Sequence, residues 1–194
     1  MVAMAGGRGA EEVLDRRRLV IVDPKVTGAA QPYHYVKEME IRAAQRHLTR
    51  CAADSTGLAL EALTRISAEL RDRGFTVMSS SILLSSARPL PDLEEILGSH
   101  PLIHTAEGEF FRQAFRGAFE RLGIPVTGIR IRDLDDWALK AFGNTAPEVH
   151  KRIDGMGRSL GAPWTKDEKT AALAAAIVLA GPHSKVHIGR SSRA

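Results

Sequence analysis

The sequence alternates short apolar segments of strand length with longer segments whose apolar residues recur at helical spacing. Leu19–Val22 is continuously apolar, which is typical of a strand that is covered on both faces. We expect further strands at Phe75–Leu84, Leu102–Ala106 and Ile124–Arg132. Strands that alternate with helices indicate an α/β fold in which a mixed, mostly parallel sheet is flanked by helices.

Helices are expected where an apolar stripe recurs every three or four residues. Within Lys37–Ala53, the side chains of Ile41, Ala44, Leu48 and Cys51 would share one helical face. A second helix is expected where apolar positions run from Leu60 to Leu70, and a short third helix is capped by Asp92 and ends at Leu97. Four more helices are expected at Glu107–Leu122, Asp133–Phe142, Ala146–Leu160 and Thr165–Ala180.

The length and the composition suit one ordinary domain with trailing ends. The chain has 194 residues, of which 44% are hydrophobic and 26% charged, so it can bury a core without disulfides. We expect a flexible N-terminal arm at residues 1–18, a single α/β domain at 19–181 and a basic tail at 182–194.

Several features indicate a cytoplasmic protein without membrane association. No secretory signal is visible, and the longest apolar run, Ala171–Ala180, is shorter than the roughly 20 residues that span a bilayer. The lone Cys51 fits a reducing compartment and a place in the core. The net charge of +4 mildly favours an anionic partner such as a nucleic acid. Nothing in the sequence determines the oligomeric state.

Glu107 is the first candidate for a functional residue, because an expected strand ends and a helix begins there. Ligands bind at the carboxyl ends of strands in open α/β sheets, and a carboxylate there can hold a divalent cation. The helix dipole alone also explains an acid at this position. His104 could act as a general acid or base, or be a core residue. On a strand, His104 and His100 would lie about 13 Å apart, too far to share one ion.

Two further acids complete the candidate set. The segment Thr165–Glu168 has the spacing of a capping box, which leaves Asp167 available as a second carboxylate and Lys166 as a phosphate contact. Asp23 ends the first expected strand, although an acid before proline is also an ordinary strand terminator. If the strands lie side by side, Asp23, Glu107 and Asp167 converge, and three carboxylates could hold two metal ions for phosphoryl transfer.

Three segments resemble the RNase H-like fold and, within it, the RuvC-type resolvases. Val20–Pro24 resembles the first acidic strand of that family, Ile103–Glu107 the second, and Asp167–Leu173 the final helix with its acids. Such enzymes cleave phosphodiesters with Mg²⁺ or Mn²⁺, so the resemblance implies three metal ligands, namely Asp23, Glu107 and Asp167. The segments IHTAEGEFFR and PWTKDEK also resemble uncharacterised bacterial proteins, which supplies no activity.

The leading hypothesis from the sequence is therefore a divalent-metal-dependent nuclease or phosphodiesterase. Glu107, Asp167 and Asp23 would hold metal, Lys166 would contact phosphate and His104 would transfer a proton. The alternative is a non-catalytic module that binds a protein or a nucleic acid and uses the same acids as helix caps. A third possibility is a small-molecule hydrolase that uses His104 and Glu107 without metal.

Overall fold

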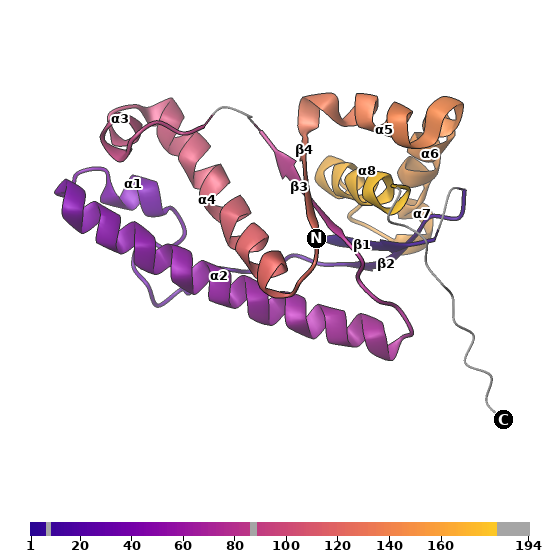
Figure 1. Cartoon of the computed structure of the whole chain (residues 1–194), viewed down its shortest axis with the longest axis horizontal. Helices are drawn as coiled ribbons and strands as arrows, with labels where there is room; N and C mark the ends of the chain where they lie inside the picture. The colour runs from indigo at the N-terminus through magenta and orange to yellow at the C-terminus, as the bar shows by residue number, and fades with distance from the viewer. Residues whose placement is uncertain (7–8, 86–88, 182–194) are drawn as a thin grey trace. The chain divides into compact units, whose positions relative to one another are not determined.

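The computed structural model describes residues 1–6, 9–85 and 89–181, which form two compact units (Figure 1). The first unit comprises Met1 and Arg17–Leu134. The second comprises Val2–Arg16 and the described residues from Asp135 onward. Each unit contains one two-stranded sheet, so the expected mixed α/β character is confirmed, but a larger parallel sheet is not found in the described ranges. The expected basic tail at 182–194 lies outside the described residues.

The first unit is built around two long helices and a parallel strand pair. Its helices are α1 (Pro32–Val36), α2 (Ile41–Asp72), α3 (Leu93–Leu97) and α4 (His100–Arg121). Its strands are β3 (Ser80–Leu84) and β4 (Val126–Arg130), which pair in parallel from Ser80 opposite Val126 to Leu84 opposite Arg130. A 3₁₀ turn, η1 (Ile131–Asp133), follows β4. The β3-α3-α4-β4 order is the one strand–helix–strand connection of the expected kind that the described chain contains.

Helix α2 runs without a break through 54–57, where the sequence suggests an interruption. Its buried positions continue at helical spacing through that segment as Cys51, Ser55 and Ala59. A stripe of this length outweighs the roughly 1 kcal/mol that one glycine costs inside a helix. Cys51 is 1% exposed, and burial raises the pKa of its thiol, in agreement with a packing role.

The expected strand at Leu102–Ala106 is wrong, because these residues lie in the first two turns of α4. Pro101 lies in the first turn of this helix, where a missing N–H costs nothing and the fixed φ suits the helix. Ile103, Ala106, Ala114 and Ala118 are all buried and lie at helical spacing. The helix expected from Glu107 onward is confirmed, with its start about two turns earlier, at His100.

The expected strand at Leu19–Val22 is also wrong. Ile21 is 5% exposed and packs on α2 and α4 beside Ala59 and Ala114, whereas Val20 is 70% exposed. The segment makes no strand pair in the described chain, so its apolar residues fill a gap between helices. Further along the chain, Pro32–Val36 forms α1, a short helix that begins at a proline.

The second unit joins an antiparallel strand pair to four helices. Strands β1 (Val2–Ala5) and β2 (Glu12–Arg16) occupy half of the stretch for which the sequence suggests a loose arm. The helices are α5 (Leu134–Phe142), α6 (Ala146–Gly155), α7 (Gly157–Leu160) and α8 (Lys166–Leu179), with the 3₁₀ turn η2 (Gly143–Thr145) before α6. Helices α5 and α8 agree with the expected helices, whereas the one helix expected at Ala146–Leu160 is divided into α6 and α7. Among the described residues, no helix has the length and apolarity needed to cross a membrane.

Candidate metal centre

Three histidines of the first unit bring their ring nitrogens together. His100 and His104 lie one turn apart at the start of α4, and their Nε2 atoms are 2.9 Å apart. His34 of α1 contacts both, with ring centroids 4.8 Å from His104 and 5.6 Å from His100. One nitrogen from each ring lies within 4.8 Å of the other two. In the described part of the chain, no other cluster of three potential ligands occurs.

The helix explains why His100 and His104 meet. Residues four apart on a helix lie on one face, about 6 Å apart along the axis, whereas on a strand they would be more than twice as far apart. The conclusion that these two residues cannot share an ion depended on the strand and is wrong for the same reason that the strand is wrong. Both side chains are exposed, whereas His34 is half-buried.

Glu107, one turn after His104, fixes the third histidine. Its Oε1 accepts hydrogen bonds from the backbone N–H groups of Tyr33 at 2.9 Å and His34 at 3.1 Å. The same oxygen is 3.2 Å from Nδ1 of His34. When Nδ1 donates to this carboxylate, Nε2 of His34 becomes the nitrogen that can bind a metal. A carboxylate behind a ligating histidine is the usual second partner in protein zinc sites.

Glu107 is buried and incompletely paired. The residue is 9% exposed, and its Oε2 has no hydrogen-bond partner among the described residues. Burial and the nearby Glu107 carboxylate raise the pKa of Tyr33. A buried negative charge attracts a cation, and three imidazoles beside it supply the ligands.

The spacing of the exposed histidine pair is close to that of two ligands of a tetrahedral metal ion. Two nitrogens bound to one Zn²⁺ at about 2.0–2.1 Å lie about 3.3 Å apart. The distance of 2.9 Å between His100 and His104 needs only a small opening of two exposed rings. Three protein ligands would leave a fourth position open, as in catalytic rather than structural zinc sites.

Apart from Glu107, the acids predicted from the sequence have a local contact or lie on the surface. Oδ1 of Asp23 accepts a hydrogen bond from the Lys25 backbone N–H at 2.8 Å within a turn. Asp167 and Lys166 are exposed in the first turn of α8, in the second unit. Glu107 and His104 lie together on α4. The convergence of Asp23, Glu107 and Asp167 stays a prediction.

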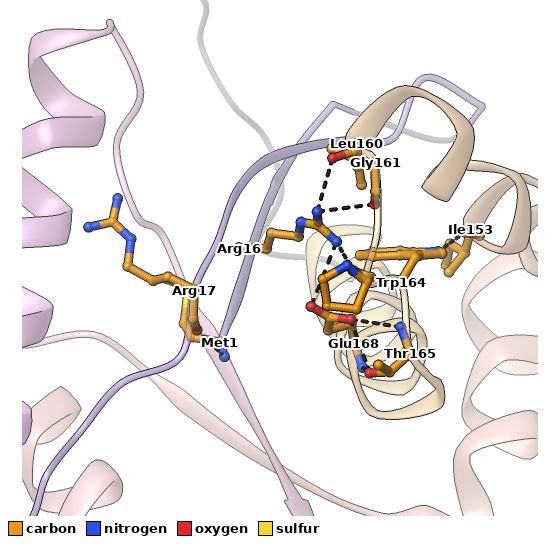
Figure 2. Close-up of polar contacts among 10 residues, drawn as sticks. Met1, Arg16, Arg17, Ile153, Leu160, Gly161, Trp164, Thr165 and Glu168 are labelled. Atoms are coloured by element: carbon orange, nitrogen blue, oxygen red, sulfur yellow. Dashed lines mark hydrogen bonds and ion pairs between the residues drawn. The ribbon is translucent and has the colours of Figure 1, made fainter.

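A second polar cluster surrounds Arg16 in the second unit (Figure 2). The guanidinium donates to the backbone oxygens of Leu160 at 2.9 Å and Gly161 at 3.1 Å, and also to that of Pro163. It lies 3.8 Å from Glu168.

Two further sets of hydrogen bonds belong to this cluster. The indole N–H of Trp164 donates to the carbonyl of Ile153 at 2.8 Å. Thr165 and Glu168 form the expected capping box of α8, which is confirmed. The Thr165 backbone N–H lowers the pKa of Glu168. All these groups are held by protein partners, so we assign this cluster a structural role.

His34 is the residue that sequence reasoning missed. Its signal is weak, because it stands in a segment with glycine and proline that reads as a loop. The stronger signal was the pair of histidines around Pro101, which becomes visible once the proline is placed in the first turn of a helix. Comparisons of this chain with protein-family models, with curated proteins and with solved structures find no match.

Proposed function

We propose that the first unit binds one divalent transition-metal ion through His34, His100 and His104. The observation that carries this proposal is the convergence of three ring nitrogens within 4.8 Å beside a buried carboxylate. Imidazole ligands suit Zn²⁺, Co²⁺, Ni²⁺ and Cu²⁺, whereas Mg²⁺ prefers oxygen. Because two of the three ligands are exposed, the open position of the ion is accessible to water or to a small ligand.

The test measures binding of Zn²⁺ by calorimetry and of Co²⁺ by visible absorption. Of the four other histidines in the sequence, His183 and His187 lie outside the described residues, so both are changed to Gln and no histidine tag is used. We expect one ion per chain and the intense visible bands of tetrahedral Co²⁺. The variants His100→Gln and His104→Gln should each lower the affinity at least about 100-fold.

His150→Gln is the matched control, because His150 is a partly exposed helical histidine of the second unit that pairs with Asp135. It should bind as tightly as the parent chain. Binding that His100→Gln and His104→Gln leave unchanged would contradict the proposal. A thiolate-to-Co²⁺ band would also contradict it, because Cys51 would then be a ligand in place of one histidine.

We retain the metal-dependent nuclease or phosphodiesterase, of RNase H-like type, as a second proposal. Its support is the buried Oε2 of Glu107, to which a cation would give the missing partner. It requires Mg²⁺ or Mn²⁺ on Glu107, Asp167 and Asp23, with Lys166 on a phosphate and His104 moving a proton. Mn²⁺ should then raise the melting temperature of the parent chain and of His100→Gln, but not of Glu107→Gln. If Zn²⁺ instead raises the melting temperature of the parent chain but not that of His100→Gln, the result supports the histidine site.

A further inference from the structure

One exposed face near the start of α2 carries cations that do not help the helix. Arg42, Arg46 and Arg50 recur every four residues, and residues 41–53 contain no Asp or Glu. Like charges at this spacing repel each other across one helical turn. Arg42 also lies in the first turn, where the helix dipole disfavours a cation.

The rest of α2 shows the reverse distribution. Residues 54–72 contain four acids and two arginines, so the helix is basic where its dipole is positive and acidic where its dipole is negative. Charges selected for helix stability would be placed the other way round. Residues that break local rules together indicate a function that compensates for the cost.

These arginines are available for a ligand. A shallow groove is lined by Arg42, Gln45, Arg46, Thr49 and Arg50, together with Ala53. All six residues are exposed. Of the three arginines, only Arg50 forms an ion pair within the described chain, with Asp54 3.9 Å from it at the surface. The carboxylate of Glu40 accepts the backbone N–H groups of Arg42 and Ala43 as the helix cap.

We propose that this face, called the arginine face, binds the phosphodiester backbone of a nucleic acid. Its three guanidinium groups would follow a line of about 12 Å along the helix, and arginine binds phosphate oxygens bidentately. Arg, Gln and Thr are all side chains that contact phosphates in such complexes. The proposal is independent of the metal centre, because it uses other residues and other contacts.

The composition of the face argues against two other occupants. An amphipathic helix on a membrane inserts large apolar side chains, and the arginine face has none. A protein interface of useful affinity is centred on buried aromatic or apolar anchors, which are also missing from these lining residues. Charge and hydrogen-bonding groups without an apolar centre fit a polyanion whose sequence is not read.

The test follows fluorescence anisotropy of a short labelled DNA duplex, and of one of its strands, with the full chain at several salt concentrations. We expect Arg42→Gln/Arg46→Gln/Arg50→Gln to reduce the dependence of log K on log salt by about 2–3 for the duplex. Between about 50 and about 200 mM salt the parent chain should then lose up to about 40-fold more affinity than the variant. The control is Arg65→Gln/Arg71→Gln, which removes two exposed arginines from the other half of α2.

A structural role is separated from binding by thermal unfolding. Because the triple variant removes repulsion between neighbouring turns, its melting temperature should equal or exceed that of the parent chain. The proposal is overturned if neither nucleic acid binds at about 50 mM salt, or if the triple variant and the control lose equal affinity. It is also overturned if vesicles with anionic lipids bind through these arginines while DNA does not.

Discussion

The histidine cluster of the first unit and the polar cluster around Arg16 in the second unit both lie near the start of a helix. They differ in how many of their polar atoms have a hydrogen-bond partner. Arg16 has a carbonyl or carboxylate partner on each side, and Trp164 and Glu168 are paired as well. In the histidine cluster, a buried carboxylate oxygen has no hydrogen-bond partner from the part of the chain that the structure describes, and two Nε2 atoms face each other at 2.9 Å.

This difference separates a structural role from a binding role. Buried polar groups in proteins are nearly always hydrogen-bonded, so a complete set indicates that the fold itself uses the cluster. An incomplete set that contains metal-ligating atoms indicates that the remaining partner comes from outside. Five substitutions test this reading, from the largest expected effect to the smallest.

The largest effect is expected in the apolar core beside the histidines. Ile103 is fully buried against Ile96 and Ala106, so Ile103→Ala should lower the free energy of unfolding by about 3 kcal/mol. Chemical unfolding followed by circular dichroism measures this loss. A loss below about 1 kcal/mol would show that the polar cluster rather than the core stabilises this part of the first unit.

Arg16→Gln should be the most damaging polar change in the second unit. Glutamine cannot reach the carbonyls of Leu160, Gly161 and Pro163 together, so we expect a loss of about 2 kcal/mol. Both tryptophans of the chain belong to the second unit, so their fluorescence during urea unfolding reports on it. Arg158→Gln, an exposed arginine of α7, should change stability by less than about 0.5 kcal/mol. Equal losses in the two variants would argue against the structural role of the cluster.

Most of the helical elements could be predicted from the sequence, since their stripes and caps are local. Asp92 accepts the backbone N–H of Glu95 at 2.9 Å, and the capping box at Thr165 forms, both as expected. The predictions of strands at Leu19–Val22 and Leu102–Ala106 are wrong, because a short apolar run fits a strand or a buried segment against helices equally well. Tertiary contacts made by Ile21 and Ile103 decided between them.

The candidate site was half visible in the sequence. The sequence predicts a site at Glu107 and His104, but it places them at the end of a strand, whereas both residues lie in α4. His34 could not be found, because its approach to His104 depends on the packing of α1 against α4. Contacts between residues about seventy positions apart have no local signal, whereas the pairing of His100 with His104 follows from helical spacing alone.

Glu107→Gln should affect metal binding more than stability. The amide oxygen can still accept the N–H groups of Tyr33 and His34, so we expect a loss of only about 1 kcal/mol without metal. The affinity for Zn²⁺ should fall about 10–100-fold, because His34 loses the carboxylate that orients it. Calorimetry and thermal unfolding of the same samples measure both quantities, with Glu94→Gln as the exposed control on α3. Unchanged affinity would remove Glu107 from the site.

The ion pair of Glu11 and Arg152 gives the second unit a stability that depends on pH. Burial alone would raise the pKa of Glu11, but the Gly9 N–H and the Arg152 guanidinium lower it below its usual range. The folded state therefore gains stability above the unfolded pKa of about 4.3, and this gain is lost as the pH falls through the lowered value. Glu11→Gln should cost about 1 kcal/mol at neutral pH and progressively less below about pH 4.

The measurement for this pair is the difference in melting temperature between the parent chain and Glu11→Gln from neutral to acid pH. Glu12→Gln, at the exposed start of β2, is the control and should show a smaller difference at neutral pH. A difference for Glu11→Gln that stays constant into acid would mean that the substitution acts through packing rather than through the charge.

The smallest effect is expected for Asp167→Asn. Asp167 is exposed in the first turn of α8, where a carboxylate gains at most a few tenths of a kcal/mol from the helix dipole. Thr165→Ala should cost more, about 1 kcal/mol, because it removes the cap of the same helix. Thermal unfolding of both variants measures these losses. The same measurement with and without Mn²⁺ tests whether Asp167 binds a cation. If Mn²⁺ stabilises the parent chain and Thr165→Ala but not Asp167→Asn, the exposed acid holds a cation and the second unit contributes to a metal site. If Mn²⁺ has no such effect, Asp167 serves the helix dipole alone, and the proposed metal site is confined to the three histidines and Glu107 of the first unit.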